Sequence, residues 1–146
     1  MANPLLTQGT LNVLRTQLIF PSLSGLNILP ENMSKKFVTI ALDGDLNKLI
    51  NTGTGAVTSP EPYVPVTISV GVLRTQSLGA AWVAQAQSLS TIGDASAFPD
   101  SASFPEMDFS TVILKHFDPG AFDGTDPVIK LMFSGIYYVN NDLWTT

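Results

Sequence analysis

The residues best suited to catalysis are His116 and Asp118, which stand two positions apart and would share one face of an extended strand. His116 is the only histidine in the chain, and there is no cysteine to act as a nucleophile. A serine hydrolase would need a serine on a sharp strand-to-helix turn, and the sequence contains no such motif. The pattern therefore favours a histidine at a strand end beside a turn aspartate over a catalytic pair.

Three aspartates, Asp118, Asp123 and Asp126, are separated by glycines and could offer carboxylate oxygens to calcium. The spacing of an EF-hand is absent, and Asp-Pro and Asp-Gly pairs are common turn formers. Residues 53–55 read Gly-Thr-Gly, but the lysine and the further glycine of a phosphate-binding loop are missing. We therefore expect no metal site, no cofactor and no catalytic centre, and we predict that the chain is not an enzyme.

The composition indicates a globular protein that hides much of its surface. The chain has 146 residues, which favours one domain, and only 13% of them are charged, against a usual share of about 25%. The net charge is −5, and the basic residues lack the clustering that grips nucleic-acid phosphates. No apolar stretch reaches the roughly 18 residues of a membrane-spanning helix, and no signal-peptide pattern opens the chain. We therefore expect a soluble protein of cytoplasmic origin that packs against copies of itself.

The clearest strand covers residues 63–73. Valines and one isoleucine occupy every second position from Val64 to Val72, and the alternate positions within this run are small and uncharged. Strict alternation is typical of a half-buried strand, but an ordinary solvent-facing side would carry Lys and Glu. Further strands are predicted at residues 10–20, 36–43, 109–117 and 128–139, the last with a bulge near Gly135.

The period of the apolar residues changes in residues 75–90, where it becomes that of a helix. The alanines of this segment favour a helix as well. We expect this to be the one substantial helix, with an apolar stripe that covers the open side of a sheet or barrel. The residues of that stripe are Leu78, Ala81, Trp82 and Leu89. The fold is therefore predicted to be mostly β (α+β), a β-sandwich or open β-barrel flanked by one α-helix.

Stretches rich in Gly, Pro, Ser and Asp mark the connections. Residues 91–108 are predicted to be one of these loops. The single domain, residues 1–146, also carries an N-terminal arm (1–9), a long inter-strand loop (46–62) and a C-terminal tail (140–146). Long loops are uncommon in compact domains and usually have a function. The tail ends in Leu143 and Trp144, apolar residues that we expect to dock on another surface.

Several stretches spread over most of the chain carry a resemblance to a known family. They are Leu11–Arg15, Ser59–Tyr63, Leu73–Gln76 with Ala80–Trp82, and Phe117–Pro127 with Tyr137–Trp144. In these stretches the chain resembles tail-tube proteins of long-tailed bacteriophages of the contractile, myovirus-like type. The resemblance implies a β-sandwich or open barrel with one helix. It also implies assembly into hexameric rings that stack into a hollow tail tube, through which the phage DNA passes.

The same resemblance implies where copies of the chain meet. A long loop and the terminal arms would contact the neighbouring ring, and an inner sheet would face the channel without binding DNA. The candidates for the inter-ring contact are Leu49, Ile50, Asn51, Thr52, Val57, Pro60, Tyr63 and Trp144. The channel-facing candidates are Thr67, Ser69 and Gly71. The partners would be other copies, the tail sheath, the baseplate and the tail terminator, in a virion tail assembled in the bacterial host cytoplasm and away from any membrane.

Two other functions stay open. A different tail component, such as a terminator or a baseplate ring protein, would form rings that do not stack. A small carbohydrate- or ligand-binding β domain would use the aromatic residues near the C-terminus as a platform. Such a domain would be a monomer with measurable ligand binding.

Overall fold

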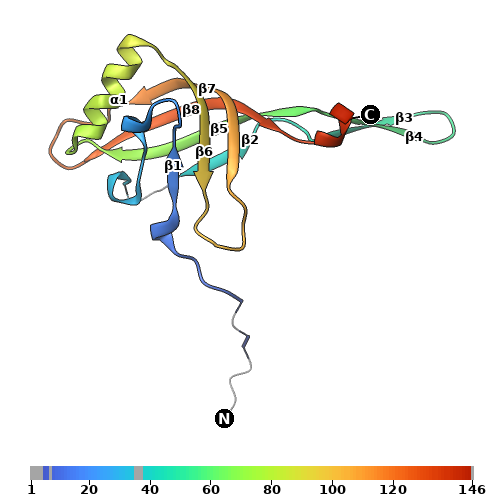
Figure 1. Cartoon of the computed structure of the whole chain (residues 1–146), viewed down its shortest axis with the longest axis horizontal. Coiled ribbons are helices and arrows are strands. Elements are labelled where there is room, and N and C mark those ends of the chain that lie inside the picture. The colour runs from blue at the N-terminus through green and yellow to red at the C-terminus, as the bar shows by residue number, and fades with distance from the viewer. Residues whose placement is uncertain (1–4, 7, 35–37, 146) are drawn as a thin grey trace.

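The computed structural model describes residues 5–6, 8–34 and 38–145, and it is mostly β with one α-helix, which confirms the predicted fold class. The elements labelled in Figure 1 follow one another along the chain. The strands are β1 (Gln17–Ile19), β2 (Thr39–Leu42), β3 (Asn47–Asn51), β4 (Ala56–Pro60), β5 (Tyr63–Leu73), β6 (Thr91–Phe98), β7 (Met107–Asp118) and β8 (Val128–Tyr138). The helix is α1 (Ser77–Ser88), and 3-10 turns form η1 (Val13–Arg15), η2 (Ser24–Leu26), η3 (Pro30–Asn32) and η4 (Asn141–Thr145).

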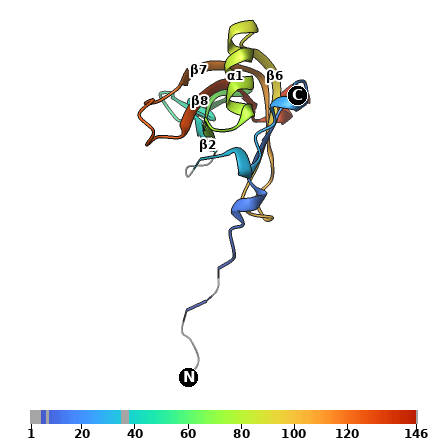
Figure 2. The ribbon, with the colours of Figure 1, turned by 90° about the vertical axis from the view of Figure 1, so that its left-hand side faces the viewer.

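One antiparallel sheet forms the body of the molecule. Its six strands follow the order β1-β6-β7-β8-β5-β2, so β1 and β2 are the edge strands. β5 and β8 pair over their full length, from Tyr63 opposite Tyr138 to Leu73 opposite Val128. The sheet curls without closing, and residues 8–12 extend away from it (Figures 1 and 2). Of the two predicted architectures, the open barrel is therefore the closer description.

The core lies between the curled sheet and α1. Trp82 of α1 is fully buried and meets Phe20 and Phe133 nearly edge-on, with ring centroids 5.0 and 5.2 Å away. Every second residue of β5, from Val64 to Val72, is buried as well, as the alternation predicts. Edge-to-face aromatic contacts are favourable beyond the area that they bury, so Trp82 anchors the helix to the sheet.

The rest of the predicted helical stripe differs in burial. Leu78 packs against the core, and Ala81 is half-buried. The prediction that Leu89 belongs to the buried helical stripe is wrong, because α1 ends at Ser88 and Leu89 is its C-cap, with an extended backbone. Its side chain is 61% exposed. The helical period therefore continues one residue further in the sequence than the helix does in the structure.

Three segments differ from their predictions. Residues 46–62 form the β3–β4 hairpin and not an irregular loop, and residues 91–108 contain the strand β6. Residues 10–20 hold only η1 and the short strand β1. β6 escaped prediction because two of its buried residues are alanines and register shifts interrupt its pairing with β7 between Thr91 and Ala95. A sequence of small residues whose apolar alternation is interrupted looks the same as that of a loop.

The predicted irregularity near Gly135 lies on the neighbouring strand. Ser110 pairs with Ile136 and Ile113 pairs with Ser134, so β7 has one residue more than β8 in this stretch. Thr111, one of the extra residues, has a φ of 53°, a left-handed backbone that is unusual for a β-branched residue. β8 itself stays in register with β5. Gly135 therefore marks the bulge by leaving room for β7.

Some predictions fall on residues that lie outside the described part of the chain. They concern residues 1–4 and 7 of the arm, residues 36–37 of one predicted strand, and residue 146 of the tail. Within the described residues, no helix is both long and apolar enough to cross a membrane.

Candidate assembly surfaces

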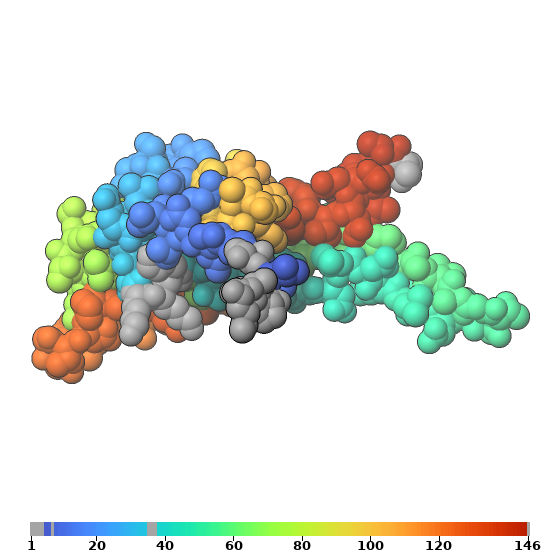
Figure 3. All heavy atoms as spheres, turned by 90° about the horizontal axis from the view of Figure 1, so that it is seen from below, coloured from blue at the N-terminus to red at the C-terminus, as the bar shows by residue number. Residues whose placement is uncertain are grey.

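The β3–β4 hairpin projects from the body along the long axis of the molecule (Figures 1 and 3). Its strands pair in register, with Ile50 opposite Val57. Thr52 and Gly55 close the turn, because the Thr52 N–H donates to the Gly55 carbonyl at 2.8 Å and the Gly55 N–H donates to the Thr52 hydroxyl at 3.1 Å. Residues 53–55 thus belong to a hairpin turn, and no resemblance to a phosphate-binding loop remains.

Apolar side chains are exposed on both faces of this hairpin. Ile50 and Val57 share one face and are 52% and 53% exposed, and Leu49 on the other face is 68% exposed. A two-stranded hairpin is only marginally stable in water by itself. Contiguous exposed apolar surface marks a site of interaction in soluble proteins. The hairpin is therefore a candidate surface for contact with another molecule.

Asn140 fixes the hairpin at its base. Its side-chain amide donates to the carbonyl oxygens of Leu46, at 2.9 Å, and Glu61, at 2.8 Å, which are the residues just outside the two strands. Asn140 has a φ of 51°, a conformation that asparagine adopts more readily than most residues. Lys48 and Glu61 add an exposed ion pair at 3.1 Å, which contributes little to stability. The direction of the hairpin is thus set by the C-terminal segment.

Further exposed apolar residues surround the base of the hairpin. Tyr63 and Tyr138 face each other across β5 and β8, and both are exposed. Trp144, in η4, is 67% exposed. Figure 1 shows the C-terminal end of the chain beside the base of the hairpin. Of the predicted inter-ring residues, only Pro60 is half-buried, and all the others lie exposed at this end of the molecule.

The outer face of β5 is small and uncharged. Thr67 and Ser69 are half-buried, and their partners across the sheet are Thr39 and Ala41 of β2 and Ser134 and Met132 of β8. The side chains of cross-strand partners lie on the same face of a sheet. The face thus continues over three strands with uncharged residues at these positions, as the sequence of β5 predicts for its own part. Charged groups lie at its borders, because the Thr67 hydroxyl donates to the Asp43 carboxylate and the exposed Lys130 of β8 lies opposite Gly71.

Gly71 differs from the other two channel-facing candidates because it is buried. The Ser34 N–H donates to the Gly71 carbonyl at 2.8 Å. A Cβ on Gly71 would lie 2.3 Å from the Ser34 hydroxyl oxygen. The segment before β2 therefore covers the sheet at this point, and only Thr67 and Ser69 remain accessible on the subunit.

The connection between β7 and β8, residues 119–127, forms a second projection, at the opposite end of the molecule from the hairpin (Figure 3). The Arg74 guanidinium organises it by donating to the carbonyl oxygens of Pro119, at 2.7 Å, Ala121, at 2.9 Å, and Asp126. The same guanidinium lies 4.7 Å from the centroid of the Phe122 ring. Sequence reasoning missed this role of Arg74, because its partners are backbone atoms about 45 to 50 residues away.

The aspartates of this connection act as turn formers. Each accepts a backbone N–H from the residue two positions on: Asp118 from Gly120, Asp123 from Thr125 and Asp126 from Val128. The Thr125 hydroxyl also donates to Asp123 at 2.6 Å, and this bond is the main reason that the pKa of Asp123 lies below its usual value. Carboxylates engaged in this way point to local structure and not to a ligand.

No set of His, Asp and Glu side chains among the described residues gathers closely enough to hold a metal ion. His116 is exposed on β7, opposite Met132 of β8. Within the described part of the chain, His116 therefore belongs to no cluster of three or more His, Asp and Glu side chains that could hold a metal ion.

No protein-family model matches the chain, and no curated protein matches it. Among solved structures, the chain is similar to the cryo-EM structure of the anti-feeding prophage cap, described as the AFP tube terminating cap. The two chains are 16% identical and have a TM-score of 0.48, and the similarity covers 94% of this chain and 97% of the other. We therefore infer the function from the surfaces of this chain itself.

Proposed function

We propose that the protein is a non-enzymatic structural subunit of a bacteriophage-type tail, which assembles with copies of itself into hexameric rings that stack into a hollow tube. The tube carries DNA without binding it and sits in the virion tail. A sheath surrounds it, and a baseplate and a terminator close its ends. This proposal joins the resemblance in sequence to the exposed surfaces of the subunit.

The observation that carries the proposal is the β3–β4 hairpin. It exposes Leu49, Ile50 and Val57, its strands pair only with each other among the described strands, and Asn140 holds it in a fixed direction. A fixed apolar projection is a suitable device for contact between subunits, because little conformational freedom is lost when it binds.

The outer face of the sheet supports the channel. Thr67 and Ser69 and their partners on β2 and β8 are uncharged, and the exposed cation of this face, Lys130, lies at its end opposite Gly71. The net charge of −5 also disfavours retention of phosphates. A surface of this kind lets a charged polymer slide.

Removal of the hairpin tests the proposal. Lys48 and Ser59 are paired, so residues 49–58 can be replaced by Asn-Gly, which forms the tight turn that two paired strands need. We expect the shortened chain to keep the circular dichroism and unfolding midpoint of the natural chain but to form no stacked tubes in negative-stain electron microscopy. A matched control is Thr54→Ser, an exposed turn position that should leave assembly unchanged.

The outcomes separate the proposal from its alternatives. Tubes of normal length from the shortened chain would remove the hairpin from the assembly contact. Rings of the natural chain that never stack would instead identify a terminator or a baseplate ring. A uniform monomer that binds sugars and does not polymerise on an added tail tip would favour the ligand-binding domain.

A further inference from the structure

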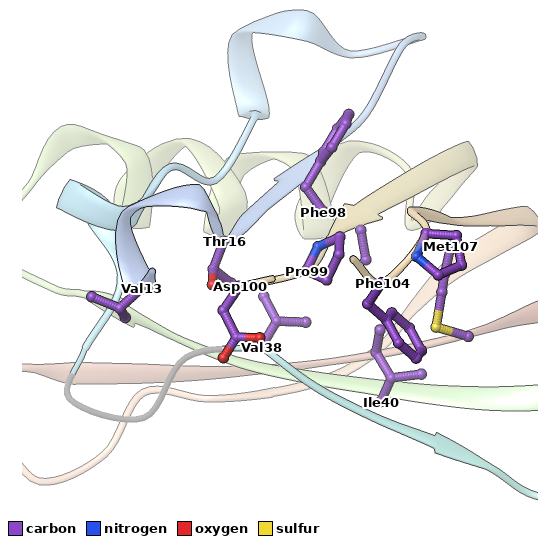
Figure 4. Close-up of a pocket in the computed structure, with 11 residues that line it drawn as sticks. Val13, Thr16, Val38, Ile40, Phe98, Pro99, Asp100, Phe104 and Met107 are labelled. Atoms are coloured by element: carbon purple, nitrogen blue, oxygen red, sulfur yellow. The ribbon is translucent and has the colours of Figure 1, made fainter. Parts of the chain in front are cut away.

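An apolar groove lies at the seam where the curled sheet fails to close. It is bounded by the edge strand β2 on one side and by the end of β6 with the connection to β7 on the other. Figure 4 shows Ile40, Phe104 and Met107 close together at one end of the groove and Val38 beside Asp100 in its middle. Its volume is about 210 Å³, whereas one water occupies about 30 Å³ of liquid. The groove therefore has room for whole apolar side chains.

One carboxylate belongs to this groove. The Asp100 side chain lines it, and the Asp100 carbonyl accepts the Asn12 N–H at 2.7 Å, which fixes the chain at this point. Asp108, at the start of β7, accepts a hydrogen bond from the Ser96 hydroxyl at 2.8 Å, and Glu106 beside it is exposed. Asp108 pairs with Ser96, so it lies on the opposite face of the sheet from Ala97 and Met107, which line the groove. Asp100 is therefore the one carboxylate among the lining residues, which are otherwise apolar except for Thr16.

One face of the β3–β4 hairpin has the complementary pattern. Ile50 and Val57 are cross-strand partners, and Lys48 lies two residues from Ile50 on the same strand. Side chains two residues apart share a face of a strand, so this face offers two branched apolar groups and one cation. With five residues in β3, the hairpin reaches about 17 Å from its base, at about 3.3 Å per residue.

The hairpin cannot fill the groove of its own subunit. It points away from the body along the long axis (Figure 1), and Asn140 holds its base in that direction. A contact between hairpin and groove therefore joins two copies head to tail. Contacts of this kind close into rings or continue into helical stacks.

We infer that the hairpin face formed by Lys48, Ile50 and Val57 binds in the seam groove of a second copy. Ile50 and Val57 enter the apolar part of the groove, and the Lys48 ammonium meets the Asp100 carboxylate. The inference rests on the proposed function, because it names the surface that receives the hairpin in the assembly. The chemistry is burial of apolar side chains, with one ion pair that fixes the register.

The absence of cysteine makes a direct test possible. A chain with Ile50→Cys is mixed with a chain that carries Met107→Cys and a mass tag, and the mixture is oxidised mildly at the concentration at which the natural chain assembles. Disulfides need Cα atoms within about 7 Å, so we expect this pair to cross-link about tenfold more than a mismatched pair. The mismatched control is Ile50→Cys with Phe122→Cys, because Phe122 is more accessible than the groove and lies at the far end of the molecule.

Equal cross-linking of the matched and mismatched pairs would overturn the inference. A third mixture, Leu6→Cys with Met107→Cys, tests the N-terminal segment, whose Leu6 is strongly exposed. Selective cross-linking of that mixture would make the N-terminal segment the occupant and would overturn the assignment to the hairpin.

Charge reversal tests the predicted ion pair. We expect Lys48→Glu and Asp100→Lys each to slow assembly about tenfold, because like charges then meet in the contact, and a chain with both changes to recover. Lys48→Glu combined with Glu61→Lys is the control, since it restores the ion pair within the hairpin but not the one with the groove. If the assembly rate recovers in this control but not in the Lys48→Glu and Asp100→Lys chain, the contact between Lys48 and Asp100 is refuted.

The two proposals fail in different ways. If the natural chain forms tubes and the shortened hairpin prevents them, but the groove pair does not cross-link, then only the receiving surface is wrong. If the natural chain does not assemble on a tail tip and the Ile50→Cys and Met107→Cys pair does not cross-link, both proposals fall.

Discussion

The β3–β4 hairpin and β5 follow each other in the chain and use similar residues, yet one is exposed and the other buried. β5 carries Val64, Val66 and Ile68 at no more than 1% exposure. Ile50 and Val57 of the hairpin are about half exposed. β5 has β8 and β2 beside it and α1 packed nearby, whereas β3 and β4 pair only with each other among the described strands.

The difference shows that the apolar residues of this chain fall into two groups, those buried within the subunit and those left exposed on it. Burial of a branched apolar side chain contributes about 1.5–3 kcal/mol to folding, and the residues of β5 and α1 obtain this within the subunit. The exposed residues of the hairpin can obtain it only from another molecule. Stability of the subunit and assembly should therefore respond to different substitutions.

The largest effect is expected in the core. Trp82→Ala should lower the free energy of unfolding by about 3–5 kcal/mol, because it removes a fully buried ring that contacts two others and leaves a cavity. Urea unfolding followed by circular dichroism measures the loss. The matched variant is Trp144→Ala, which should change the same free energy by less than about 0.5 kcal/mol while weakening assembly. If the two variants lose similar amounts of unfolding free energy, Trp144 belongs to the core and the distinction between core and assembly residues is wrong.

A smaller effect should follow from Gly71→Ala on β5 itself. The new methyl group would lie 2.3 Å from the Ser34 hydroxyl oxygen, and overpacking of this kind costs about 1–3 kcal/mol. The measurement is again the free energy of unfolding. Ser69→Ala, two residues earlier on the same half-exposed face, should be nearly neutral.

A double variant sharpens this prediction. Gly71→Ala combined with Ser34→Gly removes the Ser34 hydroxyl oxygen that the new methyl group would clash with. This double variant should therefore recover most of the lost free energy of unfolding. A double variant as unstable as Gly71→Ala would place the strain elsewhere. The next atom to consider would be Val128 Cγ1, which would lie 3.1 Å from the new methyl group.

The sequence predicts the strands whose alternation is strict and misses those whose pattern is interrupted. β5, α1 and β8 were found because large apolar residues mark their buried sides, whereas β6 buries Ala95 and Ala97, which look alike in strands and loops. The contact between Ser34 and Gly71 joins segments far apart in the chain, so no local pattern could reveal it. The hairpin resembles a loop in sequence because glycines and prolines interrupt it, and its apolar residues mark no buried side within the subunit.

The smallest effect is expected at Asn140, which connects the base of the β3–β4 hairpin to the end of β8. Asn140→Ala removes the amide that donates to the Leu46 and Glu61 carbonyls, and a neutral hydrogen bond contributes about 0.5–1.5 kcal/mol. We expect faster hydrogen exchange at the Glu61 amide, which donates to the Leu46 carbonyl, and little change in the core strands. Because the φ of Asn140 is positive, Asn140→Gly is the control that keeps the backbone relaxed while losing the same bonds. If exchange at Glu61 rises in the alanine variant but not in the glycine variant, backbone conformation holds the hairpin and the side-chain amide does not. If it rises in both, the amide is the joint, and the hairpin's direction depends on the C-terminal segment.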